Sequence, residues 1–296
     1  MDQAERLRTR MREQEQDVSV PLKSKARVIA VTSGKGGVGK TSLSVNLALQ
    51  FQRMKKRTII IDADFGLANI EVMLGIHPKS NISDLIYKDV DIKDVITKGP
   101  EGIGFISGGS GVNELVNLEL SDIRIFVSKL EKLDQYADVI IIDTGAGISD
   151  AVLEFVLGSP EVLLVLTPEP TSTMDAYALL KALNRRKDFN KEEKRIQVVS
   201  NRVKNEKEGQ TLFQNISIVA SQFLSIPLQY MGCIPQDDFA TKAVVMQKPV
   251  SMSYPNAVSS RSIAEIADAL MDVENENKTG FVGFFLNLLR AKKDRL

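Results

Sequence analysis

The chain has 296 residues, with 38 basic and 38 acidic side chains and a hydrophobic content of 43%. This composition predicts a globular protein with one sizeable α/β domain and appendages, and the balanced charge argues against nucleic acid as a partner of the general surface. Cys233 is the only cysteine and His77 the only histidine, which excludes a disulfide framework and a Cys/His zinc site.

The first 25 residues, MDQAERLRTRMREQEQDVSVPLKSK, are polar and charged and end in a stretch typical of a linker. Ala4, Leu7 and Met11 share a helical spacing, but this apolar stripe is too short to hold a helix by itself. We therefore expect residues 1–25 to be flexible. They contain no apolar signal sequence, and no later run reaches the roughly 20 apolar residues that span a bilayer, so we expect a cytoplasmic protein.

From residue 27 onward, short apolar runs alternate with amphipathic helical stretches. Six runs are continuous in Val, Ile and Leu rather than alternating, which is the pattern of strands buried on both faces. Intervening helices make such strands parallel, so residues 26–272 are predicted to form a doubly wound, mostly parallel α/β fold with ligands at the carboxyl ends of the strands. The runs are RVIAVTS, RTIIIDAD, ADVIIIDTG, EVLLVLTPE, RIQVVSNRV and LQYMGCIPQD.

A glycine-rich loop joins the first strand to the first helix and matches the pattern G-x-x-x-x-G-K-[ST] in the required context. Glycines let backbone N–H groups approach a phosphate, and the N-terminus of the helix adds its dipole. Lys40 is expected to reach the β- and γ-phosphates of a nucleotide, and the Thr41 hydroxyl to bind Mg²⁺. The predicted nucleotide-binding residues are Gly34, Lys35, Gly36, Gly37, Val38, Gly39, Lys40, Thr41 and Ser42.

Carboxylates follow two of the predicted strands. Asp62 and Asp64 end RTIIIDAD, and Asp143 closes the strand in ADVIIIDTG. A carboxylate beside the γ-phosphate can hold Mg²⁺ through water or orient the attacking water. Such residues also form turns and cap helices, but the phosphate loop at the same edge of the sheet favours the metal and catalytic roles.

A second glycine cluster, GIGFISGGSG (residues 102–111), lacks a following GK[ST] sequence. It is therefore not predicted to bind phosphate. We interpret it as a mobile loop after a strand.

The last sixteen residues, FVGFFLNLLRAKKDRL, combine an apolar helical stripe with positive charge. An amphipathic helix of this kind lies in a membrane interface, because its apolar stripe meets acyl chains while its cations meet anionic lipid. The alternative is that the helix docks on its own domain or on a partner. The preceding sequence is polar, so residues 273–296 are interpreted as a tether plus helix. The predicted membrane contacts are Phe281, Phe284, Phe285, Leu288, Leu289, Lys292 and Lys293.

The loop sequence GKGGVGKT resembles the deviant Walker A signature of the MinD/ParA family of ATPases. The resemblance implies an ATP-dependent homodimer in which Lys35 reaches the phosphates bound by the partner subunit. It makes DADFGLAN the first switch segment, with Asp62 in the Mg²⁺ shell, Asp64 positioning the hydrolytic water and Asn69 at the family's asparagine. The implied cofactors are ATP and Mg²⁺, and the implied catalytic residues are Lys35, Lys40 and Asp64.

The resemblance extends to later segments of the chain. Asp143 falls on the Walker B aspartate, and the second switch follows it, with Gly145 where many family members have proline. In the family, an asparagine after a later strand hydrogen-bonds adenine, and a Pro-x-Asp loop borders the base. An asparagine at this position, as at Asn201, favours ATP over GTP as the nucleotide. The implied base-site residues are Asn201, Arg202, Pro235 and Asp237.

Sequence features outside the nucleotide-binding motifs distinguish the branches of the family. The chain lacks the cysteine pairs that iron–sulfur members need and the tyrosine-rich tail of tyrosine kinases of this fold. The DQAERLR sequence ahead of a MinD-like ATPase resembles the FlhG (YlxH/FleN) family, which regulates flagellar number and placement. In that family the leader engages FlhF, a signal-recognition-type GTPase, and the ATPase contacts flagellar switch (C-ring) proteins. The implied GTPase contacts are Asp2, Gln3, Ala4, Leu7 and Arg8.

The same resemblance implies a membrane switch. ATP would join two subunits, two C-terminal helices would then bind an anionic membrane together, and slow hydrolysis would release them. The expected localisation is cytoplasmic and reversibly peripheral on the inner face of the cell membrane. Two alternatives stay open, a MinD-type division-site ATPase and a ParA-type DNA-partition ATPase.

Overall fold

The computed structural model describes residues 26–64, 69–88, 90–108 and 132–272. Three predicted features lie outside these residues. They are the N-terminal segment with its GTPase contacts from Asp2 to Arg8, part of the first switch (65–68), and the C-terminal tether with its membrane contacts from Phe281 to Lys293.

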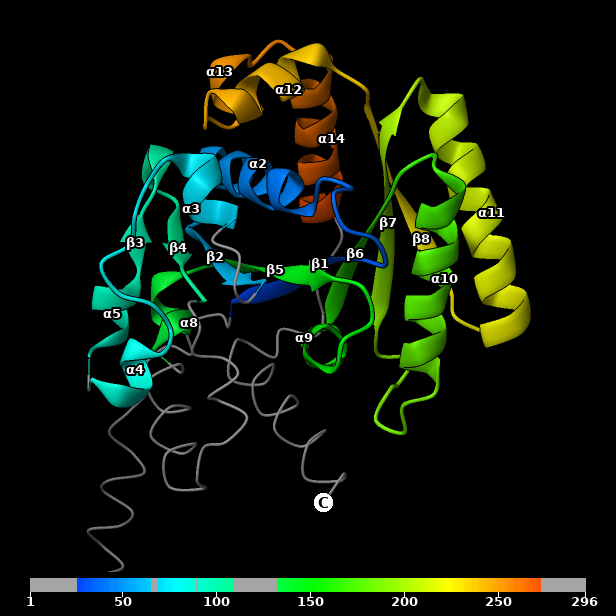
Figure 1. The fold of residues 1–296 in the computed structure, drawn as a ribbon, viewed down its shortest axis with the longest axis horizontal. Coiled ribbons are helices and arrows are strands. Elements are labelled where there is room, and N and C mark those ends of the chain that lie inside the picture. The colour runs from blue at the N-terminus through cyan, green and yellow to red at the C-terminus, as the bar shows by residue number, and fades with distance from the viewer. Residues whose placement is uncertain (1–25, 65–68, 89, 109–131, 273–296) are drawn as a thin grey trace, which may run out of the picture.

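One eight-stranded sheet organises the described residues (Figure 1). Its strands are β1 (Arg27–Ser33), β2 (Thr58–Ala63), β3 (Thr97–Lys98), β4 (Gly104–Ile106), β5 (Val139–Ala146), β6 (Glu161–Leu166), β7 (Arg195–Val203) and β8 (Leu228–Pro235). They lie in the order β3-β4-β2-β5-β1-β6-β7-β8, and every pairing is parallel except that of β3 with β4. Each of the six predicted runs forms a strand, which confirms the doubly wound, mostly parallel fold.

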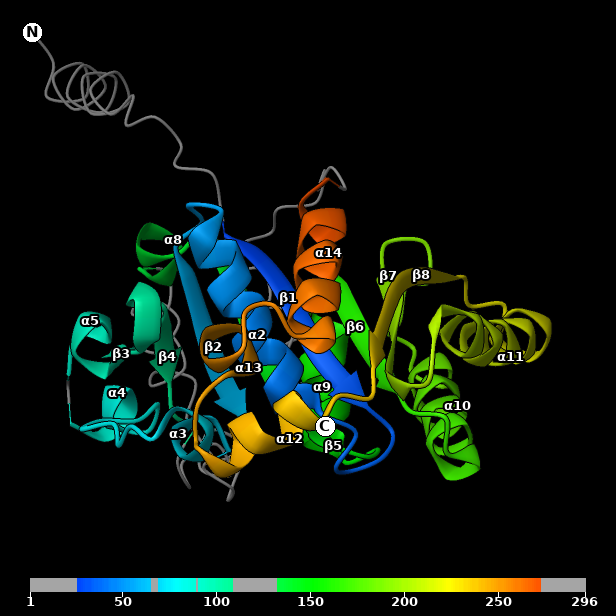
Figure 2. The same cartoon turned by 90° about the horizontal axis from the view of Figure 1, so that it is seen from above.

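Helices connect the strands and cover both faces of the sheet (Figures 1 and 2). They are α2 (Lys40–Arg53), α3 (Asn69–Leu74), α4 (Asp84–Tyr87), α5 (Ile92–Val95), α8 (Leu133–Tyr136), α9 (Asp150–Gly158), α10 (Pro170–Asn184), α11 (Glu206–Leu224), α12 (Asp238–Val245), α13 (Val250–Ser253), α14 (Val258–Asp272) and the 3-10 turn η1 (Pro100–Gly102). α2 and α14 pack together over one face, and α9, α10 and α11 cover the other. In Figure 2, α12 lies at the end of the sheet toward which β1 and β2 point. Within the described ranges, no helix has the length and apolarity needed to cross a membrane.

Strand β1 shows why the apolar runs are continuous. All seven of its residues are buried. Ile29 and Val31 pack into the cluster beneath α2 and α14, whereas Val28 joins Ile140 in a separate cluster on the opposite face. A strand covered on both faces has no solvent side, so apolar side chains occupy successive positions.

The interpretation of residues 102–111 as a loop is wrong for Gly104–Ile106, which form β4 beside β2. Phe105 is fully buried there. A Cβ atom at Gly104 would lie 2.9 Å from the Ile96 side chain and 3.0 Å from that of Ile59, so glycine permits close packing at this position. The strand β4 has only three residues, one of which is glycine, so it is too short to show a strand pattern in the sequence.

Candidate nucleotide site

The loop between β1 and α2 ends on a glycine that begins the helix. Gly39 is the N-cap of α2 and has a φ of 96°, in the left-handed region that favours glycine. A Cβ atom there would lie 2.5 Å from Asn201 Nδ2, so glycine also permits the close approach of β7. Among the described residues no side chain caps α2, and its first N–H groups are therefore available to an anion such as phosphate.

Gly34 fixes the start of this loop against α10. A Cβ atom at Gly34 would lie 2.1 Å from the carbonyl carbon of Asp175 and 2.4 Å from the backbone nitrogen of Ala176. The contact joins two backbones, so rotation of a side chain cannot relieve it. The loop is thus held between β1, α2 and α10.

The Lys40 ammonium lies inside the loop, where Lys40 is 7% exposed. It donates to Ser33 Oγ at 3.1 Å, and the Ser33 hydroxyl donates to the backbone oxygen of Lys35 at 2.6 Å. Burial lowers the pKa of Lys40, and the negative charges of Asp143 and Asp64 oppose that shift. A phosphate entering the loop would meet a buried cation, for which it is a better partner than a neutral hydroxyl.

Two buried carboxylates stand side by side at the carboxyl ends of β2 and β5. Asp62 and Asp143 are register partners in adjacent parallel strands, and they are 2% and 0% exposed. Burial, and then the charge of Asp143, raises the pKa of Asp62 to about 7. Burial raises the pKa of Asp143 to about 6. Two buried acids repel each other when ionised, so a cation between them favours their charged forms.

Helix α2 holds the Asp143 carboxylate. Asp143 Oδ1 accepts a hydrogen bond from Ser44 Oγ at 2.9 Å, and the nearby Thr41 hydroxyl lowers the pKa of this carboxylate. Asp143 Oδ2 is buried and has no hydrogen-bond partner among the described residues. An orphaned carboxylate oxygen beside a hydroxyl fits Mg²⁺ or one of its waters. Within the described ranges no group of three acidic, His or Cys side chains is arranged so that it could hold a metal ion by itself, so Mg²⁺ would need phosphate and water oxygens as its other ligands.

The first switch brings a third carboxylate to the site. Asp64 Oδ2 accepts a hydrogen bond from Asn69 Nδ2 at 2.8 Å, and the Asp64 backbone N–H donates to Asp62 Oδ1 at 3.1 Å. A Cβ atom at Gly145 would lie 3.1 Å from Asp64 Oδ1. The two predicted switch segments therefore meet at Asp64, and Asn69 sets the orientation of its carboxylate.

Lys35, the other lysine of the loop, has its hydrogen-bond partners away from Lys40. Lys35 Nζ donates to the Glu169 carboxylate and, at 2.8 Å, to Thr171 Oγ1. Its side chain is 34% exposed, and that of Glu169 is 54% exposed. Both partners belong to the start of α10, outside the cradle that holds Lys40. The two lysines therefore have different environments within one short loop.

Asn201 links β7 to the phosphate loop. Its Nδ2 donates to the backbone oxygen of Val38 at 2.7 Å, and its Oδ1 accepts from the Arg202 backbone N–H at 2.9 Å. Arg202 has a φ of 57°, in the left-handed region that is strained for a residue with a side chain. The strand register shifts between Asn201 and Val203, so this bulge directs Arg202 outward beside the loop.

A cavity of about 100 Å³ lies against Asn201 and is lined by Gly39, Arg202, Pro235 and Asp237. The structure thus brings together the residues predicted to border the base. Asp237 also has a structural role that the sequence did not indicate. Its carboxylate accepts from the Phe239 backbone N–H at 2.9 Å and from the Ser259 hydroxyl at 2.8 Å. One carboxylate thereby joins the beginnings of α12 and α14 beside the cavity.

Several contacts at the site are not evident from the sequence. Ser44 lies three residues after Thr41, on the same side of α2, and this spacing could have indicated a second hydroxyl near Asp143. Glu169 and Thr171 follow the strand β6, but nothing in the sequence connects them with Lys35. Such pairs become visible only when the order of the strands is known.

Comparison with known proteins agrees with this geometry. The family model of the CobQ/CobB/MinD/ParA nucleotide binding domain matches residues 29–250. Antiactivator FleN of Pseudomonas aeruginosa is 39% identical over 253 residues, 85% of this chain and 89% of FleN. Flagellum site-determining protein YlxH of Helicobacter pylori is 31% identical over 268 residues, 86% of each chain. The Mg-ADP complex of MinD from Pyrococcus horikoshii has the same fold, with a TM-score of 0.64 and 20% identity over 83% of this chain and 96% of that one. The chain therefore belongs to the MinD/ParA nucleotide-binding family and, within it, to the branch that contains FleN and YlxH.

Proposed function

We propose that the chain is an Mg²⁺-dependent ATPase that dimerises when it binds ATP and that regulates flagellar number and placement. The main support for this proposal is that the two lysines of the loop lie in different environments. Lys40 is buried with Asp62 and Asp143, whereas Lys35 reaches outward to Glu169. One lysine can serve the nucleotide of its own subunit while the other is presented to a second subunit.

The proposed nucleotide contacts follow from the site geometry. The loop from Gly34 to Ser42 would cradle the phosphates, because its backbone N–H groups and the start of α2 attract anions. Lys40 would bind the β- and γ-phosphates. Asn201 would hydrogen-bond adenine, with Arg202, Pro235 and Asp237 around the base.

Asp62, Asp143 and Thr41 would hold Mg²⁺, directly or through its waters. When bound, the ion neutralises charge that develops on the phosphate oxygens. Asp64 would orient the attacking water, since its carboxylate is fixed by Asn69. In this scheme the protein mainly positions groups, which is consistent with slow hydrolysis that acts as a timer.

Dimerisation is proposed through Lys35. In the single chain its ammonium is held by Glu169 and Thr171 at an exposed position, where it can exchange these partners for a phosphate of a facing subunit. The bond to Glu169 is partly solvated, so breaking it costs little. ATP, with its γ-phosphate, would supply the stronger anionic partner.

The flagellar role is proposed from the similarity of the chain to two flagellar proteins. FleN of P. aeruginosa is called an antiactivator, and YlxH of H. pylori is called flagellum site-determining. For this chain we propose that residues 1–25 engage the GTPase FlhF, that residues 26–272 form the ATPase and contact flagellar switch proteins, and that residues 273–296 bind an anionic membrane. The protein would alternate between the cytoplasm and the inner face of the cell membrane.

A vesicle pelleting assay tests the membrane arm of this proposal. The full chain is expected to pellet with anionic phosphatidylglycerol vesicles in Mg·ATP and to stay in the supernatant in Mg·ADP. Phe285→Asp should abolish pelleting while ATP binding persists, because it removes apolar surface from the predicted helix. Unchanged pelleting of this variant would refute the membrane role of residues 273–296. Deletion of residues 2–25 should abolish GTPase stimulation and leave pelleting intact.

A further inference from the structure

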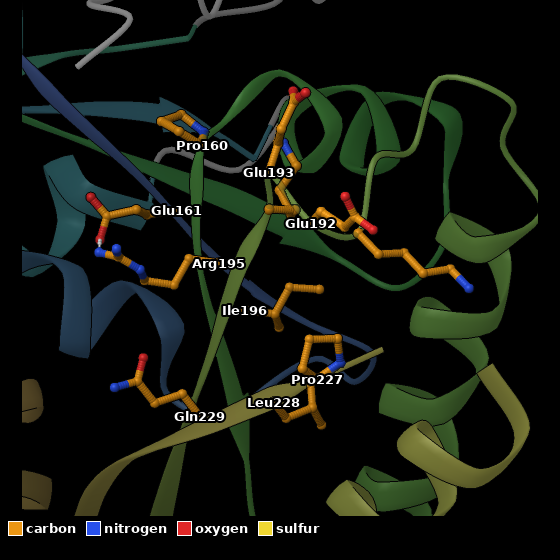
Figure 3. Close-up of a pocket in the computed structure, with 11 residues that line it drawn as sticks. Pro160, Glu161, Glu192, Glu193, Arg195, Ile196, Pro227, Leu228 and Gln229 are labelled. Atoms are coloured by element: carbon orange, nitrogen blue, oxygen red, sulfur yellow. Dashed lines mark ion pairs between the residues drawn. The ribbon is translucent and has the colours of Figure 1, made fainter. Parts of the chain in front are cut away.

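A cavity of about 450 Å³ opens at the end of the sheet opposite the phosphate loop. It lies where β6, β7 and β8 begin, among the loops that precede these strands (Figure 3). Pro160, Ile196, Pro227 and Leu228 give the cavity apolar surface. Its volume falls in the range of ligand-binding pockets.

The three cations that line this cavity are engaged within the protein. Lys191 Nζ donates to a backbone oxygen at the end of α11, and Lys194 Nζ donates to two backbone oxygens at the end of α9. Arg195 lies 3.7 Å from the buried carboxylate of Glu161. These positive charges therefore offset helix dipoles and one buried acid.

Carboxylates at the mouth of the cavity remain exposed. Glu192 and Glu193 are both exposed residues of the loop before β7, and Figure 3 shows them on the side of the cavity away from Pro227 and Leu228. The two ammonium groups bond to backbone oxygens of the protein, whereas these two carboxylates are exposed, so the carboxylates are the charged groups that a ligand meets first at the mouth.

The cavity adjoins a free edge of the sheet. β8 is the last strand, and its outer edge has no backbone hydrogen-bond partner among the described residues. From Leu228 to Tyr230 the strand pairs regularly with β7, and a bulge with Gly232 at a φ of 131° follows. The straight part of the edge is therefore the part next to the cavity, where alternate N–H and C=O groups can pair with an added strand.

Acidic side chains also flank this edge. Glu206 of α11 accepts hydrogen bonds from the Tyr230 hydroxyl at 3.1 Å and from the Cys233 thiol at 2.9 Å. Burial, followed by this hydrogen bond, raises the pKa of the Cys233 thiol to about 12, and the charge of Glu265 on α14 adds to the rise. Negative charge thus lies on both helices beside β8. A second copy that paired through the same edge would bring like charges together, which disfavours a symmetric edge-to-edge dimer.

We propose that this cavity and the adjoining edge of β8 form a docking site for an extended basic peptide of another protein. The peptide adds as a ninth strand beside Leu228 to Tyr230 and places one apolar side chain against Ile196 and Pro227. Main-chain hydrogen bonds give affinity, and Glu192 with Glu193 selects Lys or Arg next to the apolar residue. The site is remote from the phosphate loop, so docking does not need nucleotide.

A pair of synthetic peptides tests the proposal on the full chain. The basic probe is acetyl-KVKLKVK-amide, and its counterpart carries Glu at every Lys position. Fluorescence anisotropy is expected to show binding of the basic probe alone. Hydrogen–deuterium exchange should then slow at residues 228–231 when that probe is present.

Charge reversal at the mouth provides the matched comparison. The double variant Glu192→Lys/Glu193→Lys should bind the basic probe at least about tenfold more weakly. Asp94→Lys, a reversal at an exposed position of α5 near the opposite edge of the sheet, should bind it as the unchanged chain does. Lys40→Ala should also bind normally, so failure of the nucleotide proposal would leave this result unaffected.

Four outcomes would overturn the proposal. Equal binding of the acidic probe would remove the charge argument, and protection at other strands would remove the location. Slow exchange at residues 228–231 in the peptide-free chain would mean that the chain covers its own edge. Protection that grows with protein concentration would make a second copy the occupant.

Discussion

Asn201 Nδ2 donates a hydrogen bond of 2.7 Å to the backbone oxygen of Val38, in the middle of the phosphate loop. The two residues are far apart in sequence, and the bond ties the carboxyl end of β7 to the loop that follows β1. An asparagine amide has two N–H donors and two acceptor lone pairs. After its bonds to Val38 and to the Arg202 backbone, one donor and one lone pair remain for adenine, so base recognition and loop position share one side chain.

Replacing Asn201 tests this coupling. Asn201→Ala is expected to weaken ATP binding by about 10- to 100-fold, because it removes a base contact and leaves the Val38 carbonyl without its partner. GTP binding should change much less, so the expected preference for ATP shrinks. Asn215→Ala, an exposed residue of α11, is the matched control, and titration calorimetry with both nucleotides is the measurement. An unchanged ratio of the two affinities would contradict the assignment of Asn201 to the base.

Ser44 is expected to govern the response to Mg²⁺. Ser44→Ala removes the donor to Asp143 Oδ1, so the carboxylate loses one anchor beside the proposed metal position. The Mg²⁺ concentration for half-maximal ATP binding should rise about tenfold, while ATP binding in EDTA stays close to that of the unchanged chain. Ser221→Ala, at an exposed position of α11, serves as control. Equal losses with and without Mg²⁺ would assign Ser44 to packing alone.

Alanine substitutions at two glycines of the loop test the backbone contact between the loop and α10. Gly34→Ala should lower the free energy of unfolding by about 2 kcal/mol or more, because the new Cβ overlaps the backbone of α10. Gly36→Ala should change it by less than about 0.5 kcal/mol, since its nearest neighbour, the Cβ of Ala146, would lie 3.8 Å away. Urea unfolding of the nucleotide-free chains measures both values. Similar losses for the two variants would contradict the contact with α10.

Asp62 makes the nucleotide-free protein sensitive to pH. Its folded pKa is about 7, above an unfolded value of about 3.9, so the folded state holds the proton more tightly between these values. Stability from this group is therefore present below about pH 4 and is lost as pH rises through 7. Asp62→Asn should stabilise the protein at pH 8 by roughly 1–3 kcal/mol and much less at pH 4.5.

Urea unfolding in EDTA at the two pH values measures this effect of Asp62. Asp268→Asn, at an exposed position of α14, should show no such pH-dependent gain. Equal stabilisation by Asp62→Asn at pH 4.5 and pH 8 would show that burial does not raise the pKa of the Asp62 carboxyl group.

The strands and the phosphate site were predictable because the signals are local. Continuous apolar runs identify strands buried on both faces, and the carboxyl-end rule brings Asp62 and Asp143 to the edge where the loop lies. β4 was missed because packing of Phe105 in the core, and not a strand-like sequence, determines that segment. The fold class thus follows from patterns that each segment carries alone.

Contacts between distant segments could not be predicted in the same way. The partners of Lys35 on α10 depend on the position of β6 beside β1. The bond from Asp237 to Ser259 depends on how α14 returns to the sheet. Polar side chains of this kind have many possible partners, and only the assembled layers select one.

In the proposed function, ATP joins two copies of the chain through Lys35. Sedimentation velocity of the full chain in Mg·ATP, with Asp64→Ala to slow hydrolysis, measures this association. We expect twice the monomer mass in Mg·ATP, the monomer mass in Mg·ADP, and the monomer mass in both when Lys35→Ala is added to this chain. A monomer in Mg·ATP, or a dimer that persists without Lys35, would refute ATP-dependent dimerisation through this lysine.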